Sequence, residues 1–378
     1  MKGRPTISEI VLVSFLVVLA KGKDVRYKKH EEDNAQIFTY QQVNKIIQMK
    51  GGDIYDCVDV NEQPAFNHPL LKDHKIQMKP SSLPVGMDIE SSVPDSFLQV
   101  EPSIIECPIG TIPMLRSNRS GTIATHNVDG LSNDLQWETA GITYQGDIYG
   151  TRATLNVYEP KMNKNSKDFS AIWVQMNSGA GERGDKIGVG LRVSPALSGD
   201  TSVRFHIAWY DGYYKKSCID HGCPGFVQTD HNVGLGAKVV PVSVIGGQQK
   251  IMIVRIFKDP YTKNWWIFLN NRKIGYWPTG LFEFIRDKGD SAFWGGWVEG
   301  PTASSNSPPM GSGRFAKEGF GRAAFIRNVQ IAGANGTFVT REVGHGSSDP
   351  SKYTVDGFEV HKDGSMGMYF GGPGSNKA

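Results

Sequence analysis

Hydrophobic and polar residues alternate over short segments throughout the chain beyond residue 138, and turn residues separate these segments. Alternation of this kind predicts strands that are buried on one side. Ten strands are expected, at 153–158, 170–176, 186–193, 202–210, 238–244, 251–257, 265–269, 273–277, 293–298 and 323–331. Helical spacing in this half is confined to 281–286. Because a single sheet could not bury both of its faces, the pattern favours an all-β fold, a two-sheet antiparallel β-sandwich.

The N-terminal third has weaker patterning. Val43, Ile46 and Ile47 have helical spacing and two glycines follow, so residues 41–50 are predicted to form a short amphipathic helix. Residues 53–60 alternate like a strand. Together these segments predict a small α+β unit ahead of the sandwich.

Composition indicates where this unit ends. Prolines impose an extended path on 63–71. Residues 80–102 are rich in Ser and Pro, as linkers are. Residues 117–134 are rich in Asn and Gly and also lack a strand or helix pattern. We place the domain boundary in that second loose stretch. The N-terminal unit with its linker is therefore expected to span 21–130, and the sandwich 131–378.

The first 20 residues have the features of a secretory signal peptide. Lys2 and Arg4 precede an apolar run at 10–20, in which Val18 and Ala20 occupy the small-residue positions that a signal peptidase prefers. The run is about half as long as a spanning helix requires. Cleavage near Ala20 is therefore expected, with a retained membrane anchor as the alternative. The mature protein is expected to be secreted, with no membrane partner.

Composition and charge narrow the possible partners. The net charge is only +3, and no Lys/Arg-dense run is long enough to follow a phosphate backbone, which argues against nucleic acid. Residues 179–184 fit the G-x-G-x-x-G pattern of dinucleotide sites, but a strand follows them instead of a helix, so no cofactor is expected. Asn118 and Asn335 begin sequons, which are glycosylation sites if they are exposed in a secreted protein.

The four cysteines are expected to form disulfides in an oxidising compartment. Cys218 and Cys223 flank a glycine at a spacing that suits a small closed loop, which leaves Cys57 and Cys107 for each other. This is the favoured pairing of the three that the sequence allows. A metal site built from the close pair and His221 is the alternative, but it lacks a fourth ligand.

Two tryptophans in the predicted strand 293–298, Trp294 and Trp297, are candidates for a ligand site. Their first expected role is in the core or in a cleft wall. Stacking on a sugar or a proline ring is the functional alternative, and their exposure distinguishes the two.

Long ordered motifs resemble those of the plant neprosin family. Residues 53–72 and 107–113 resemble the activation-peptide region of neprosin-like proteins. The second half carries motifs of the neprosin domain, which are Cys218-x4-Cys223-Pro-Gly-Phe-Val-Gln228, Lys258-Asp-Pro260, Asn264-Trp-Trp266, Gly275-Tyr-Trp-Pro278, Met310-Gly-Ser-Gly313, Glu318-Gly-Phe-Gly321 and Tyr369-Phe-Gly-Gly-Pro-Gly374. The similarity covers nearly everything after the first 20 residues.

The resemblance implies a secreted plant protein that is made as a zymogen and has a catalytic β-sandwich. The family's studied enzymes resemble glutamic endopeptidases that cut after proline in acid. Two glutamates face each other across the cleft, where they activate water and protonate the leaving group or stabilise the oxyanion. This division needs one carboxylate and one carboxylic acid, which proximity provides by splitting their pKa values.

Both glutamates are replaced in this chain. The family's first glutamate lies in a motif of the form Ile-Glu-(Ala/Val)-Gly-Trp, where this chain has Gly188. The second lies in Gly-Gly-Glu-(Val/Ile), where this chain has Trp297. The family's aromatic-Trp-Thr run before the first cysteine of the domain corresponds to Ile207-Ala-Trp209, so the cleft wall has changed too.

Glu299 is the nearest candidate for a substitute acid. On a regular strand it points to the same side as Trp297 but lies roughly 6–7 Å from it. A general base must come within about 3 Å of its water or act through one more water. Losing one acid or base costs ~10²–10⁴ in rate, and two are lost here.

We therefore expect a neprosin-like protein without peptidase activity. Its cleft is expected to bind a proline-rich peptide or a cell-wall glycan, with Trp297, Trp294 and Trp209 as stacking residues. One alternative is an active glutamic-type endopeptidase that uses Glu299. Another is a structural or storage protein, which predicts a closed cleft with Trp294 and Trp297 buried. The sequence leaves the oligomeric state open.

Overall fold

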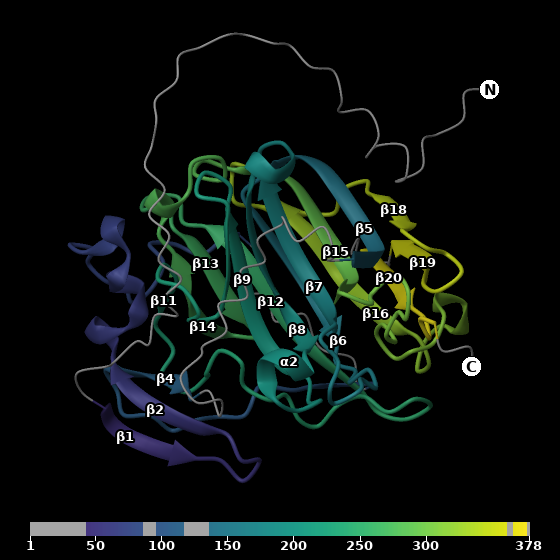
Figure 1. Cartoon of the computed structure of the whole chain (residues 1–378). Helices are drawn as coiled ribbons and strands as arrows, with labels where there is room; N and C mark the ends of the chain where they lie inside the picture. The colour runs from purple at the N-terminus through teal and green to yellow at the C-terminus, as the bar shows by residue number, and fades with distance from the viewer. Residues whose placement is uncertain (1–42, 86–95, 117–135, 361–365, 376–378) are drawn as a thin grey trace, which may run out of the picture.

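The computed structural model describes residues 43–85, 96–116, 136–360 and 366–375. Their strands form one three-stranded sheet and two larger, largely antiparallel sheets that stack as a sandwich (Figure 1). The predicted all-β sandwich is thus confirmed. The expected signal peptide and the sequon at Asn118 lie outside the described residues. Within the described ranges, no helix is long and apolar enough to span a membrane.

The first large sheet has seven strands in the order β10-β9-β8-β7-β15-β5-β18. In that order their bounds are Lys216–Ile219, Arg204–Asp211, Asp185–Val193, Phe169–Ser178, Gly289–Gly300, Gln136–Ile148 and Gly344–Ser347. β7 is central and pairs antiparallel with β8 on one side and β15 on the other. In Figure 1 this sheet lies in front of the second large sheet.

The second large sheet has ten strands, eight of them in the order β11-β14-β13-β12-β6-β16-β20-β19. In that order their bounds are Val227–Gln228, Arg272–Trp277, Trp265–Leu269, Gln249–Lys258, Gly150–Asn156, Ala324–Ala332, Met366–Gly371 and Thr354–Val360. β17 (Phe338–Val339) pairs with β16, and β3 (Phe97–Gln99) pairs in parallel with β12. The predicted linker at 80–102 is therefore partly wrong, because β3 lies within it.

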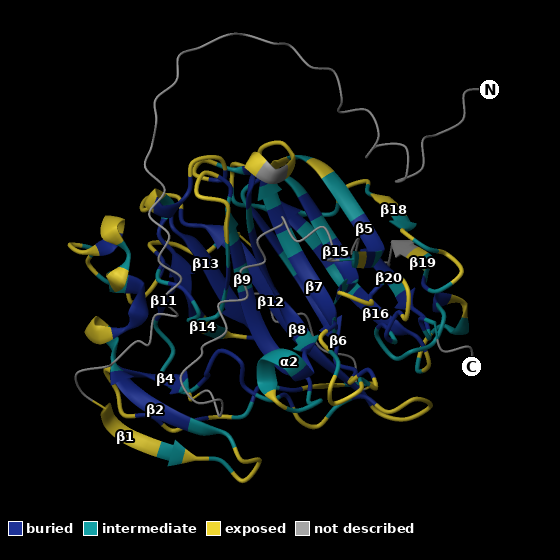
Figure 2. Ribbon diagram, viewed as in Figure 1, coloured by how far each residue is buried: buried dark blue, intermediate teal, exposed yellow. Residues whose placement is uncertain are grey.

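The inward sides of the two large sheets form one hydrophobic core, which is dark blue in Figure 2. β8 contributes Ile187, Val189 and Leu191, and β12 contributes Val254 and Ile256 from the opposite sheet. All five side chains are at most 1% exposed. The alternation of the strands therefore determines which residues face the core and which face outward.

Three local predictions were wrong. Residues 41–50 were predicted as a helix, but Val43–Gln48 forms β1, which pairs with β2 (Ile54–Asp59) across a glycine turn in which Gly52 has φ +88°. Pairing with a neighbouring strand overrides local helical spacing here. The predicted helix at 281–286 is only the end of a 3₁₀ turn, Thr279–Leu281.

The predicted strand at 238–244 is also absent. Lys238 and Val239 make isolated bridges to Arg204 and Pro102, and the ladder stops before Pro241. Proline has no N–H to donate, so it ends pairing on this side.

The N-terminal region packs against the sandwich. β1, β2 and β4 (Thr111–Leu115) form the small sheet at the lower left of Figure 1. The prolines at 64 and 69 begin 3₁₀ turns, where an extended path was predicted. Ala65 and Phe66 pack on an apolar cluster on the outward side of the ten-stranded sheet, which includes Trp266 and Tyr276.

Polar contacts reinforce this attachment. The backbone N–H of Gln228 donates to the side-chain oxygen of Gln63 at 2.7 Å. Arg204 donates to both carboxylate oxygens of Asp53, at 2.8 and 2.9 Å. The N-terminal region is therefore held by buried hydrogen bonds and an ion pair as well as by apolar packing.

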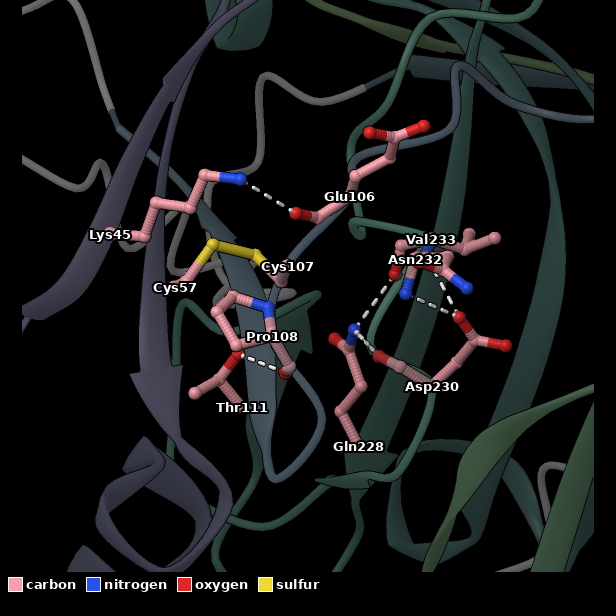
Figure 3. Close-up of a disulfide and its surroundings, with 10 residues drawn as sticks. All are labelled: Lys45, Cys57, Glu106, Cys107, Pro108, Thr111, Gln228, Asp230, Asn232 and Val233. Carbon is pink, nitrogen blue, oxygen red and sulfur yellow. Dashed lines mark hydrogen bonds between the residues drawn. A yellow bond between two sulfur atoms is a disulfide. The ribbon is translucent and has the colours of Figure 1, made fainter.

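The two predicted disulfides are present. Cys57 pairs with Cys107 and Cys218 with Cys223. Figure 3 shows the first bridge, with Lys45 of β1 donating to the carbonyl of Glu106 beside it. The bridge ties β2 to the segment before β4, which stabilises the small sheet.

Replacing Cys57 and Cys107 together by alanine is expected to lower the free energy of unfolding by about 4 kcal/mol, because this bridge closes the longer loop. The residues it joins are 50 positions apart, against 5 for Cys218 and Cys223. The same change at the second pair is expected to cost about 2 kcal/mol. Urea unfolding of both double variants measures the difference, and equal losses would contradict the loop-length explanation.

Candidate functional site

The two positions that the sequence motifs match to the family's glutamates lie on the outward side of the seven-stranded sheet. Gly188 is in β8 and Trp297 is in β15, the strands that flank β7. Their neighbours Ile187 and Val298 are fully buried in the core, so alternation directs residues 188 and 297 outward. We name this side of β9, β8, β7, β15 and β5 the outer face.

The strand register determines how far apart these two positions are. Gly188 lies opposite Gln175 of β7, and Trp297 lies opposite Ala171. They are two strands and four residues apart, which corresponds to roughly 16 Å between Cα atoms in a flat sheet. Trp173, on the outer face of β7, lies between them.

The indole of Trp173 occupies the space where a side chain at position 188 would begin. A Cβ atom on Gly188 would lie 2.6 Å from the indole nitrogen Nε1. A Cβ atom on Gly190 would lie 2.7 Å from Cε3 of the same ring. Trp173 is only 7% exposed. A glutamate at position 188 would therefore require this indole to move.

A second aromatic ring covers glycines of β15 and β5, which lie on the opposite edge of β7 from β8. A Cβ atom on Gly295 or on Gly141 would lie 2.7 Å from the ring of Phe293. Four glycines share one register level with Trp173 across the sheet: Gly190, Gly295, Gly141 and Gly346. Glycine permits such close approach because it has no side chain. The middle of the outer face is thus covered by aromatic rings, and one of them, Trp173, lies over Gly188.

Aromatic and charged side chains gather at one end of the outer face. Glu299 lies opposite Trp137 of β5 and Phe169 of β7. Trp137 is 53% exposed, whereas Trp297, Phe169 and Glu299 are half-buried. The guanidinium carbon of Arg192 lies 3.5 Å from the centroid of the Phe169 ring. We name these five residues the aromatic end.

Glu299 is placed as the sequence predicted, on the same side as Trp297. Burial raises the pKa of Glu299 above its ordinary value of 4.5, although Arg192, Lys186 and the indole N–H of Trp297 oppose the shift. A raised pKa suits a general acid. However, Glu299 is six register positions from Gly188, and it is the only carboxyl group in the aromatic end.

Trp294 and Trp209 were predicted to stack on a ligand, and this was wrong. Trp294 is fully buried, and its indole N–H donates to the hydroxyl of Thr151 in β6 at 3.0 Å. Trp209 is 6% exposed and packs edge-on against Trp277. Both therefore point between the sheets, and only Trp297 of the three predicted residues lies on the outer face.

The metal alternative at the close cysteine pair was also wrong. Cys218 and Cys223 are bonded to each other, and Nε2 of His221 lies 2.8 Å from the side-chain oxygen of Gln228. The described residues contain no group of three or more potential metal ligands. Asn335 is exposed in the turn between β16 and β17, as glycosylation would require.

Sequence reasoning missed four residues of the outer face. Trp173 and Phe293 lay in predicted strands, but only the register shows that they cover glycines. Trp137 precedes the first predicted strand, within β5, where polar neighbours hid the alternation. Arg192 is four residues after Gly188 on the same strand, which places it on the same side.

Gly188→Ala is expected to lower the free energy of unfolding by roughly 1–3 kcal/mol, because the new methyl group collides with the indole of Trp173. Alanine in an open strand position would instead stabilise slightly. Gly280→Ala is the matched control, since its Cβ would meet nothing within 4 Å.

Chemical unfolding of these variants in both the wild-type and the Trp173→Ala backgrounds gives a double-mutant cycle. The cost of Gly188→Ala should largely vanish in the Trp173→Ala background. A cost that is unchanged there would show that the indole is not its cause.

Comparisons with known proteins agree with the motifs. The family model described as Neprosin matches residues 166–373, and the one described as Neprosin activation peptide matches residues 46–142. Among solved structures, scytalido-glutamic peptidase with a peptide-based transition state analog matches at 10% identity and a TM-score of 0.34, covering 62% of this chain and 98% of that chain.

The carbohydrate recognition domain of Emp46p in its potassium-bound form matches at 10% identity and a TM-score of 0.23, covering 44% of this chain and 80% of that chain. CG-16, a homodimeric agglutinin from chicken liver, matches at 10% identity and a TM-score of 0.18, covering 44% and 92%. These structural similarities are low and add nothing to the family assignment. The Neprosin match alone spans more than half of the sequence, so this chain belongs to the neprosin family.

Proposed function

We propose that this protein is a catalytically degenerate member of its family that binds a ligand on the outer face without cleaving it. The observation that carries the proposal is the filling of the first acid position, where the indole of Trp173 lies over Gly188. The ligand is a proline-rich peptide or a cell-wall glycan. Two disulfides support a secreted protein, because such bridges persist in oxidising compartments.

The physical case against peptide hydrolysis depends on the number of acids. Hydrolysis by a glutamic pair needs one group to activate water and another to protonate the leaving group. Position 188 provides no side chain and position 297 provides an indole, whose N–H has no basic or acidic role at ordinary pH. Glu299 alone could serve as one of the two groups, and no partner lies beside it in the aromatic end.

A structural or storage role is the second candidate. The filled middle of the outer face favours it, since Trp173 leaves no room above Gly188. The burial of Trp294 does not support a structural or storage role, because that ring belongs to the core between the sheets. The exposed ring of Trp137 and the half-buried ring of Trp297 lie in one cluster with Phe169, which argues for a binding surface because grouped apolar surface marks interaction sites.

Incubation with a library of proline-containing peptides at acidic and neutral pH is expected to give no cleavage by the wild-type protein. Glu299→Gln should therefore change nothing. Restoring both acids, with Gly188→Glu and Trp297→Glu together in a Trp173→Ala background that opens the space above position 188, should raise the cleavage rate at least ~10²-fold, because one acid or base is typically worth ~10²–10⁴.

Mass spectrometry of the digests measures the rates. Wild-type cleavage that disappears in Glu299→Gln would overturn the proposal in favour of a displaced acid. Wild-type cleavage that persists in Glu299→Gln would overturn it as well. The single variant Trp297→Glu is the control for the double variant and should remain inactive.

A further inference from the structure

Arg192 reaches across the sheet to the aromatic end. It lies opposite Ala171 of β7, whose small side chain leaves room for the arginine to pass above it. Its guanidinium group stacks on the ring of Phe169, with its central carbon 3.5 Å from the ring centroid. The stack fixes the planar group beside Glu299 and Trp297, because Phe169 lies opposite Glu299 in the register.

The hydrogen-bonding capacity of this guanidinium is largely unused. Its Nε is buried and has no partner, and one Nη lies 3.4 Å from the hydroxyl of Ser194, near the limit for a hydrogen bond. None of the ion pairs between described residues includes Arg192. A guanidinium group has five donors in a planar fork that matches a carboxylate.

The charge of Arg192 persists at physiological pH although the surroundings disfavour it. Burial lowers the pKa of Arg192 to about 10, and Glu299 only partly opposes that shift. Bringing a cation into a poorly hydrated site costs free energy unless an anion pairs with it. An anionic ligand would supply that partner while the Glu299 carboxyl group is protonated.

A hollow with further cations adjoins this end of the sheet. It has a volume of about 510 Å³ and lies between residues 161–168 and 301–309. Phe169 directly follows the first of these segments, and the second begins directly after β15. Lys161 and Lys167 line the hollow, together with amide and hydroxyl side chains, Met162 and three prolines.

The one carboxyl group that lines the hollow, that of Asp168, already has hydrogen-bond partners. Asp168 is buried, and its carboxylate accepts hydrogen bonds from the backbone N–H and the hydroxyl of Thr302. It therefore links the two segments and leaves the lysines as the exposed charges. Amides and hydroxyls beside lysines suit a ligand that is rich in hydroxyl groups and negatively charged.

We propose that the aromatic end binds an acidic polysaccharide, with a uronic acid carboxylate on Arg192 and a sugar ring against Trp297 or Trp137. This assignment rests on the proposed binding function and names its ligand. A uronate chain repeats its carboxylate along its length, so it can engage Arg192 and the lysines of the hollow together. A proline-rich peptide without Asp or Glu offers only its terminal carboxylate, which matches Arg192 alone.

Glu299 makes this binding dependent on pH. Its pKa is raised by burial, and the charged groups that act on it are Arg192 and Lys186, while β5 and β7 present Trp137, Thr139 and uncharged residues. Below its pKa the carboxyl group is neutral and can donate a hydrogen bond. Above its pKa the carboxylate repels a uronate and competes for Arg192.

Calorimetric titration with a hexamer of galacturonic acid tests the assignment. The hexamer is expected to bind, and its fully methyl-esterified form should bind at least ~10-fold more weakly, because esterification removes the charge without altering the rings. Arg192→Gln should weaken binding of the acid ~10- to 100-fold. Arg192→Lys keeps the charge but loses the planar fork, so an intermediate loss is expected.

Arg327→Gln is the matched control. Arg327 also lies among aromatic rings, with its guanidinium carbon 5.1 Å from the centroid of Phe325, but it is in β16 of the other sheet. Its replacement should leave binding unchanged. Thermal unfolding of each variant establishes that it is folded before its affinity is compared, and the ester comparison on the wild-type protein needs no variant at all.

The affinity of the wild-type protein for the hexamer should fall as the pH rises through the raised pKa of Glu299, because its carboxyl group loses its proton there. Glu299→Gln should remove most of this dependence while keeping the preference for the acid over the ester. A pH dependence that is unchanged in Glu299→Gln would contradict this role of Glu299.

The possible outcomes distinguish an error in the proposed ligand from an error in the proposed binding function. Equal binding of the acid and its ester, or unchanged affinity in Arg192→Gln, would overturn carboxylate recognition and leave a binding protein for neutral glycans. Binding of a proline-rich peptide but not of the hexamer would overturn the polysaccharide and leave the binding function intact. Absence of binding to all three probes overturns the polysaccharide, and peptide cleavage by the wild-type protein would overturn the proposed function itself.

Discussion

β7 lies between β8 and β15, and its hydrogen bonds to both fix the register of the outer face. Ile172, Val174 and other alternate residues of β7 fill the core, so the residues between them must point outward. A slip of one residue would bring Trp173 into the core and expose its apolar neighbours. Burial of the inward side therefore fixes what the outer face contains, including Gly188 and Trp297.

The replacement of both acids that the family motifs lead us to propose would also change the packing above the sheet. A glycine at position 188 removes a carboxyl group and at the same time allows the indole of Trp173 to approach the backbone. That contact gains dispersion energy and removes apolar surface from water. The aromatic covering can therefore stabilise the sheet while preventing a carboxylate from entering, so restoring one acid without moving the indole would meet a steric cost.

Much of the fold followed from alternation, whereas the site depended on long-range pairing. The strands of the sandwich were predicted because one side of each is apolar, and the bridges at Cys57 and Cys218 followed from spacing. Strand parity alone would have separated Trp294 from Trp297, since residues three apart point to opposite sides of a strand. No local signal places Arg192 on Phe169, because that contact requires β8 and β7 to pair in one register. The helix predicted at 41–50 failed for the same reason, since pairing with β2 decided its conformation.

The outward sides of the two large sheets differ in how their aromatic residues are covered. On the ten-stranded sheet, Trp266 and Tyr276 are fully buried beneath Ala65 and Phe66 of the N-terminal region. On the seven-stranded sheet, Trp137 remains 53% exposed. The two outward surfaces therefore differ at these positions, and in our proposal the exposed ring of Trp137 contributes to ligand binding at the aromatic end.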